Sequence, residues 1–223
     1  MLAFLTALSV GAEYLETDVH ASHDGIAVIS HDDDLARLAG KQVRIDQLTM
    51  AELQQIGLGH GQAFCSLAEA LDAFPTARFN IDIKSDAAVE PTAQAILSAG
   101  AVSRVLIASF SDRRRKAAVR MLPGVATSAS SRASLWTVVA ARLGLVGPVR
   151  MLLRRLDAVQ LPETVKGIRI VTPRLVRVVH RAGAEVHVWT INDVPAMTRL
   201  LAMGVDGIVT DRADLAIDLF RPN

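Results

Sequence analysis

Short runs of β-branched and apolar residues alternate along this chain with longer segments of helical spacing, and this alternation constrains the fold more than any other feature. The strand candidates are Tyr14–His20, Phe79–Lys84, Val105–Ser109, Val125–Ser128, Ala158–Leu161, Val186–Ile191 and Gly207–Thr210. The helical candidates between them include Ser66–Ala73, Glu90–Ala99, Arg113–Met121, Arg174–Arg181 and Pro195–Met203. Repeated strand–helix units of this kind predict an α/β fold with a parallel sheet.

Two architectures are built from such units, the doubly wound sheet and the closed barrel. The seven candidate strands are one fewer than the eight of a (β/α)8 barrel. Asp24-Gly25 predicts a turn, followed by a short extra strand at residues 26–30. Residues 1–223 contain no linker and no low-complexity tract, so we expect one domain.

The charged residues are nearly balanced, with 24 basic and 23 acidic side chains and a formal net charge of +1. A surface that binds nucleic acid normally needs a clustered basic excess, so we expect no nucleic-acid partner. The basic runs at residues 113–116 and 154–155 adjoin helical segments, and we interpret them as solvated helix faces. Cys65 is the only cysteine, which excludes an intrachain disulfide and favours a reducing, cytoplasmic location.

Two apolar stretches resemble membrane segments at first sight. Residues 1–11 lack a basic start and have helical apolar spacing, which predicts an amphipathic core helix ending at Gly11 rather than a secretion signal. The stretch Leu135–Leu153 is interrupted by two arginines, two glycines and a proline, so it does not predict a transmembrane helix. Peripheral membrane contact there stays open.

Acidic residues share one face on two of the predicted strands. Side chains two positions apart point to the same side of a strand, so Glu16 and Asp18 point one way. By the same rule Asn80, Asp82 and Lys84 share a face. A buried parallel strand is normally a continuous apolar run, so these faces must line a region that tolerates charge. In a barrel that region is the active site at the carboxyl ends of the strands.

Three carboxylates that converge at such a site repel one another unless a cation neutralises them. Oxygen ligands favour Mg²⁺ or Ca²⁺ over zinc. The alternative from spacing alone is that the acids pair with Lys84 and nearby arginines, without any metal.

Histidines and one tryptophan complete the candidate site. His31 follows the extra strand, within loop reach of Glu16 and Asp18, and its near-neutral pKa suits a general acid or base. His20 flanks the same turn and is a candidate for substrate contact. Trp189 shares a strand face with His187 and is interpreted as a pocket wall.

Four segments together resemble the glycerophosphodiester phosphodiesterase family. GAEYLETDVHASHDGIAVISHDDDL resembles the pattern in which a strand with Glu-x-Asp is followed by a turn, a strand and His-Asp-x-x-Leu. FNIDIK resembles the next strand of that family, and VHVWTIND with GVDGIVTDRADL resembles its last two strands. The similarity runs from Met1 to Leu219, and the four segments occur in the family's order.

The resemblance implies roles for particular residues. The family's metal ligands match Glu16, Asp18 and Asp82, although the third ligand is more commonly Glu. One of its two catalytic histidines matches His31, a phosphate-contacting lysine matches Lys84, and a wall of its substrate pocket matches Trp189.

The resemblance also implies that part of the family pattern precedes Met1. The family begins with a strand ending in His-Arg-Gly and a loop with Glu-Asn-Thr, and neither occurs in this sequence. We therefore expect a (β/α)8 TIM-type barrel that lacks its first strand, and we expect that Met1 is not the natural start of the domain.

The function that the resemblance implies is metal-dependent hydrolysis of a small glycerophosphodiester to sn-glycerol 3-phosphate and an alcohol, with Mg²⁺ or Ca²⁺ as the cofactor. One alternative is a related phospholipase-type phosphodiesterase that acts on an intact lipid. Another is an inactive remnant that binds metal or a phosphoester without turnover.

Overall fold

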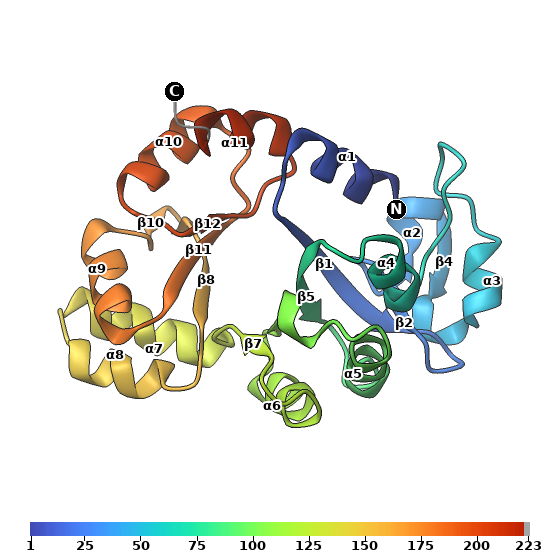
Figure 1. The fold of residues 1–223 in the computed structure, drawn as a ribbon, viewed down its shortest axis with the longest axis horizontal. Helices are drawn as coiled ribbons and strands as arrows, with labels where there is room; N and C mark the ends of the chain where they lie inside the picture. Colours follow the sequence, from blue (N-terminus) through green and yellow to red (C-terminus); the bar gives the residue numbers. More distant parts are fainter. Residues whose placement is uncertain (221–223) are drawn as a thin grey trace. The chain divides into compact units, whose positions relative to one another are not determined.

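The computed structural model describes residues 1–220, which fall into two compact units (Figure 1). Among these residues, the first unit consists of Met1–Leu8 with Glu13–Ala126, and the second of Ser9–Ala12 with residues 127–220. Each unit has its own sheet, its own helices and its own hydrophobic cluster.

The first unit is built on a sheet with the strand order β2-β1-β5-β6-β7. Its strands are β1 (Tyr14–Ala21), β2 (Ala27–Ile29), β5 (Arg78–Ile83), β6 (Val105–Ala108) and β7 (Ala126–Thr127), the last at the boundary of the unit. Strand β5 pairs in parallel with both β1 and β6, whereas β2 turns back antiparallel to β1. The expected turn at Asp24-Gly25 is confirmed, with Gly25 at a positive φ of 77° that glycine adopts without strain.

Four helices accompany these strands, and two of them have serine N-caps. They are α1 (Leu2–Val10), α4 (Leu67–Ala73), α5 (Val89–Ser98) and α6 (Asp112–Met121). Ser66 and Glu69 form a capping box at the start of α4, and Ser111 caps α6. The helices predicted at these places, α1 and α4 to α6, are therefore confirmed to within one or two residues.

A small lobe between β2 and α4 was not predicted from the sequence. It contains β3 (Asp34–Leu35), α2 (Ala36–Ala39), β4 (Lys41–Arg44), the 3-10 turn η1 (Ile45–Gln47) and α3 (Met50–Gln54). Val28, Leu35, Ile45, Leu53 and Phe64 form its own buried cluster. The elements are too short for periodicity to reveal them.

The apolar faces of β1 and β5 form the centre of the first core. Phe79, Ile81 and Ile83 are fully buried, and Leu15 and Val19 of β1 join the same cluster. Burying a side chain of this size contributes about 1.5–3 kcal/mol, which fixes the register of both strands. The polar residues between these positions are consequently held on the opposite face.

Helix α1 corrects one prediction in part. The helix is present, but none of its residues is fully buried, and Leu2 and Leu5 are 45% and 56% exposed. Phe4 packs edge-on against the rings of Phe74 and Phe79, with centroid distances of 6.1 and 5.9 Å. Helix α1 therefore covers the core of the first unit instead of belonging to it, because only one side of this nearly all-apolar segment meets the sheet.

The second unit contains three parallel strands in the order β12-β11-β8. These are β8 (Ala158–Pro162), β11 (Glu185–Trp189) and β12 (Gly207–Ile208), and a hairpin of β9 (Thr164–Val165) and β10 (Ile168–Arg169) follows β8. The helices are α7 (Ser131–Arg142), α8 (Val146–Leu153), α9 (Pro173–Ala182), α10 (Val194–Ala202) and α11 (Ala213–Phe220). The strand expected at Gly207–Thr210 is thus two residues shorter, although Val209 N–H still donates to the carbonyl oxygen of Val188 at 2.9 Å.

All seven strands that the sequence predicted as barrel strands are present, namely β1, β5, β6, β7, β8, β11 and β12. Strand β7 is only two residues long, shorter than the predicted Val125–Ser128. Within residues 1–220, no helix has both the length and the apolar composition needed to cross a membrane.

Candidate active site

The acidic residues of β1 and β5 lie side by side on one face of the sheet. In the parallel register, Glu16 lies opposite Asn80 and Asp18 lies opposite Asp82. The shared face that strand alternation predicted is confirmed, because the neighbouring positions Leu15, Thr17 and Val19 are buried on the other side.

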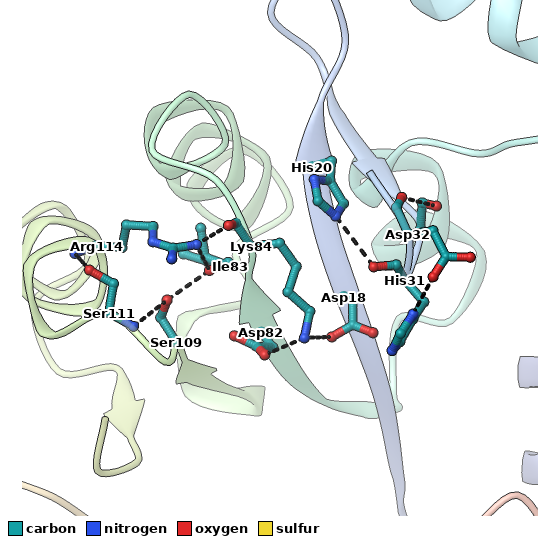
Figure 2. Close-up of polar contacts among 11 residues, drawn as sticks. Asp18, His20, His31, Asp32, Asp82, Ile83, Lys84, Ser109, Ser111 and Arg114 are labelled. Atoms are coloured by element: carbon teal, nitrogen blue, oxygen red, sulfur yellow. Dashed lines mark hydrogen bonds and ion pairs between the residues drawn. The ribbon is translucent and has the colours of Figure 1, made fainter. Parts of the chain in front are cut away.

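Lys84 lies between two of these carboxylates (Figure 2). Its Nζ is 2.7 Å from Oδ1 of Asp18 and 2.6 Å from Oδ2 of Asp82. Both carboxylates are largely shielded from water, since only 11% of each side chain is accessible. The sequence spacing left open whether the acidic residues pair with Lys84. Asp18 and Asp82 do pair with it, and the two contacts hold its ammonium group in one place.

The cluster retains more negative charge than Lys84 neutralises. The pKa of Glu16 is raised to about 7, mainly by loss of solvation and then by the negative charges of Asp18 and Asp82, against the opposing effects of Lys84 and His31. Glu16 is open to water on one side, yet enough protein surrounds it for desolvation to dominate. Burial also raises the pKa of Asp18, although its hydrogen bond to Lys84 acts in the opposite direction.

The lysine itself stays charged at neutral pH. Burial alone would lower the pKa of Lys84, but its hydrogen bonds to Asp18 and Asp82 raise the pKa above the usual value. The ring of Phe110 also lies under the ammonium group, with Nζ 5.3 Å from the ring centroid.

Two buried oxygen atoms on this face fit a divalent cation. Among the residues described, Oδ1 of Asp82 and Oδ1 of Asn80 are buried and accept no hydrogen bond. Unpaired buried oxygens and an excess of carboxylates are what a hard cation would satisfy. In the present arrangement of the side chains of residues 1–220, no three His, Cys, Asp or Glu residues lie close enough together to hold a metal ion. The ligand role of Glu16, Asp18 and Asp82 stays a prediction.

His31 and His20 come from the hairpin side of the site. The Nδ1 of His31 is 2.7 Å from Oδ1 of Asp32, and the His31 side chain is 72% exposed (Figure 2). Hydrogen bonds from His31 and Arg37 lower the pKa of Asp32. The Asp32 carboxylate is therefore ionised and accepts a hydrogen bond from Nδ1–H of His31. His20 is buried, with Nε2 3.4 Å from the carbonyl oxygen of His31, and burial lowers the pKa of His20.

Arg114 is a site residue that the sequence did not reveal. Its Nη1 donates to the carbonyl oxygen of Ile83 at 3.1 Å and also to that of Lys84. Ser109, at the end of β6, donates from Oγ to the same Ile83 oxygen at 2.7 Å. These contacts hold the backbone at the point where Lys84 leaves β5 (Figure 2).

The interpretation of residues 113–116 as a solvated helix face is half wrong. Arg113 and Lys116 are largely exposed, but Arg115 is buried against Asp112 and Arg114 reaches back to β5. The available signal was the N-cap Ser111, which starts α6 directly after β6 and thereby places Arg114 in the first turn.

Trp189 lies in the second unit, at the end of β11, where it is half-buried. The predicted contact of Trp189 with substrate stays a prediction.

The chain is similar to known proteins over nearly its whole length. The model of the glycerophosphoryl diester phosphodiesterase family matches residues 1–215. A probable glycerophosphodiester phosphodiesterase 2 of Mycobacterium tuberculosis is 44% identical over 220 residues, which cover 98% of this chain and 83% of the relative. A glycerophosphodiester phosphodiesterase of Caldanaerobacter subterraneus is 28% identical over 233 residues, with coverage of 98% and 90%.

Solved structures show the same fold. The phosphodiesterase domain of a Mycobacterium tuberculosis protein matches with a TM-score of 0.82 at 18% identity, covering 99% of this chain and 92% of that one. An Oleispira antarctica phosphodiesterase, solved with the product sn-glycerol-3-phosphate, matches with a TM-score of 0.77 at 20% identity and coverage of 98% and 88%. The predicted α/β class, that of the (β/α)8 barrels, is confirmed by this likeness. With a family match over nearly its whole length, the chain belongs to the glycerophosphoryl diester phosphodiesterase family.

Proposed function

We propose that this protein hydrolyses glycerophosphodiesters to sn-glycerol 3-phosphate and an alcohol, with residues 1–223 acting as one catalytic domain. The observation that carries the proposal is the Asp18–Lys84–Asp82 bridge beside Glu16, on adjacent strands of a family member. A charged lysine held next to excess carboxylates provides both parts that a phosphodiester requires, namely a cation-binding group and a phosphate-binding group.

Glu16, Asp18 and Asp82 are the residues that would hold a divalent cation, Mg²⁺ or Ca²⁺. When bound, the cation supplies Lewis acidity toward the phosphodiester and orients the glycerol hydroxyls. The buried, unpartnered oxygens of Asp82 and Asn80 support this role, because each would gain a partner from a cation or its water. The pKa of Glu16 is raised mainly by burial and also by the negative charges of Asp18 and Asp82, and a bound cation would offset both effects.

Lys84 stabilises the negative charge that develops on the phosphate oxygens. Asp18 and Asp82 fix its ammonium group from two sides, so it needs little rearrangement when the charge appears. Arg114 positions Lys84 indirectly, because it donates hydrogen bonds to the backbone carbonyl oxygens of Ile83 and Lys84.

His31 transfers a proton. Because the ionised Asp32 accepts from Nδ1, the neutral ring carries its proton there and leaves Nε2 able to take one. His20, which lies within hydrogen-bonding reach of the His31 carbonyl, holds this loop, and we propose it together with Trp189 for contact with substrate.

The decisive experiment is a direct assay of product. Purified protein is incubated with glycerophosphocholine and Mg²⁺ or Ca²⁺, and glycerol 3-phosphate is measured with a coupled dehydrogenase. We expect turnover that EDTA abolishes. Lys84→Met should lower kcat by about 10²–10³-fold with little change in KM, the pattern of a group that acts on developing charge.

The control is Lys116→Met, which removes an exposed lysine on α6 of the same unit. If the wild-type protein binds the cation but releases no glycerol 3-phosphate, the catalytic proposal is wrong and the binding-only alternative holds. The single, half-buried cysteine favours the cytoplasm, and this location stays a prediction.

A second candidate function is hydrolysis of a lipid that keeps an acyl chain. The exposed apolar side chains of α7 and α8 favour it. Replacing glycerophosphocholine by lysophosphatidylcholine in the same assay separates the two: the preferred substrate is the one with the higher kcat/KM.

A further inference from the structure

Helices α7 and α8 of the second unit expose large apolar side chains. Leu143 and Met151 are 65% and 77% exposed, and Trp136 is 51% exposed. Leu135, Val139 and Leu145 add to the same surface, which we call the α7–α8 face. Scattered apolar residues are normal on any protein, but six large ones on two adjacent helices are not.

The α7–α8 face contains a groove of about 530 Å³. Trp136 and Val139 of α7 and the adjoining Leu143 line it at the spacing of one helical stripe. Pro148, Met151 and Leu152 line it from α8. The walls are almost entirely apolar side chains. The buried residues of α7 and α8, such as Val138 and Val149, lie in the core of the second unit, so the exposed stripe is not needed for folding.

The charge around this face has one sign. Residues 131–156 contain five arginines and no Asp or Glu. Residues 164–184, which include α9, contain four arginines and one lysine and again no acidic residue. Helix α9 packs against both α7 and α8, so these charges belong to one part of the second unit. Although the net charge of the whole chain is only +1, much of its basic charge therefore lies in residues 131–156 and 164–184.

Two of the arginines are fixed by the backbone of their neighbours. Nη2 of Arg142 donates to the carbonyl oxygen of Arg169 at 2.7 Å, and Nη2 of Arg150 donates to that of Arg181 at 2.9 Å. Both side chains belong to exposed residues, so their charge stays available to a partner. No carboxylate on these helices neutralises them.

We propose that the α7–α8 face binds the surface of an anionic lipid bilayer. Helices with an apolar side and arginines beside it enter the interface between head groups and acyl chains, and the arginines attract anionic lipids. A second copy of the chain fits less well, because two identical basic surfaces repel each other. The proposal does not depend on the catalytic activity.

Vesicle binding tests the proposal without any activity measurement. Full-length protein is mixed with phosphatidylcholine vesicles and with vesicles that also contain phosphatidylglycerol, and the bound fraction is measured by sedimentation. We expect binding to the anionic vesicles, much weaker binding to the neutral ones, and loss of binding at high salt. Emission of Trp136 should shift to shorter wavelength with the anionic vesicles, and Trp136→Phe should remove that shift.

Two kinds of variant separate the apolar contribution from the charge. Leu143→Glu and Met151→Glu change exposed positions, so they should fold normally and lower the vesicle partition coefficient by about tenfold or more each. Arg132→Gln and Arg154→Gln should each lower it by about fivefold. The control is Leu97→Glu on α5 of the first unit, where Leu97 is 49% exposed, and it should bind as the wild type does.

Three results would overturn the proposal. The first is that the protein does not bind anionic vesicles, and the second is that wild type and Leu143→Glu bind them equally. The third is that the protein forms a concentration-dependent dimer, which Leu143→Glu dissociates, and does not bind vesicles. The last would assign the face to a second copy of the chain. Circular dichroism of each variant shows that it is folded before the comparison is made.

Discussion

Both units place polar side chains on one face of adjacent parallel strands, but the two clusters differ in charge and in hydrogen bonding. In the first, Asp18 and Asp82 share Lys84 beside Glu16. In the second, Nε2 of His187 lies 2.9 Å from Oε2 of Glu185, and Nδ1 of His187 lies 3.4 Å from Nε2 of Gln160.

We propose that the difference separates a cation-binding cluster from one that supports structure. The first cluster has three carboxylates and one lysine, so it keeps a net negative charge. It also contains buried oxygens of Asn80 and Asp82 without a partner, whereas none of the buried unpartnered atoms in residues 1–220 belongs to β8, β11 or β12. The second cluster has one carboxylate, one imidazole and one amide. Polar residues on parallel strands therefore indicate a binding site only when they leave charge or hydrogen-bonding capacity uncompensated.

The largest expected effect comes from removing the negative charge of the first cluster. Glu16→Ala should abolish tight binding of Mg²⁺ or Ca²⁺ and, with it, turnover, because a carboxylate ligand is lost from a site that has few others. Isothermal titration calorimetry measures the binding. Glu185→Ala removes the carboxylate of the second cluster and should change neither quantity.

Asp82→Glu is the conservative counterpart. Glu is the more common residue at the matching position of the family, so this variant should still bind the cation. If Glu16→Ala binds the cation as tightly as the wild type, the assignment of the first cluster is wrong.

The next effect concerns the histidines that accompany each cluster. His31→Ala should lower kcat by about 10²–10⁴-fold with a modest change in KM, as expected for lost proton transfer. The His31 side chain is 72% exposed, so the change should not affect folding. His187→Gln is the matched change in the second unit and should leave kcat near the wild-type value. Equal rates for His31→Ala and wild type would remove His31 from the mechanism.

The sequence was enough to predict the first cluster because strand alternation is a local rule. Leu15, Val19 and Ile81 have to be buried, and this alone forces Glu16, Asp18 and Asp82 to one side. The seven parallel strands were predicted from another local signal, short runs of β-branched and apolar residues between helical segments. Strands β7 and β12 are shorter than expected because their ends are set by tertiary pairing.

What could not be predicted depends on contacts between distant residues. Arg114 lies 30 positions after Lys84, and nothing in its own helix indicates that its guanidinium contacts the end of β5. The lobe of β3, β4 and α3 is built from elements of two to five residues, below the length at which periodicity is informative. Helix α1 was expected in the core, but a segment that is apolar all round gives no sequence signal for which side meets the sheet.

A smaller effect is expected from Arg114, which acts on the first cluster only through the backbone. Arg114→Met should lower kcat by about tenfold, since Lys84 loses part of its support. It should also cost about 1–2 kcal/mol of stability, because the Lys84 carbonyl loses a charged donor while Ile83 keeps Ser109. Arg113→Met, at the exposed neighbouring position, is the control. If Arg114→Met lowers stability but leaves kcat unchanged, Arg114 supports the fold and does not position Lys84.

The smallest expected effect is on the pH dependence of stability, and it tests the electrostatic part of the comparison. In the native protein Glu16 keeps its proton up to a pKa of about 7, whereas in the unfolded chain it loses the proton near its ordinary value of 4.5. Between these values the native state binds more protons, so Glu16 makes the free energy of unfolding decrease as the pH rises from about 4.5 to 7. Water reaches one side of Glu16, which keeps the slope shallow. Urea unfolding in EDTA at several pH values from 5 to 8 measures how the free energy of unfolding depends on pH. Glu16→Gln should flatten the curve over this range, while Glu185→Gln should keep the wild-type slope. Identical slopes for wild type and Glu16→Gln would mean that neither burial nor the charges of Asp18 and Asp82 raise the pKa of Glu16.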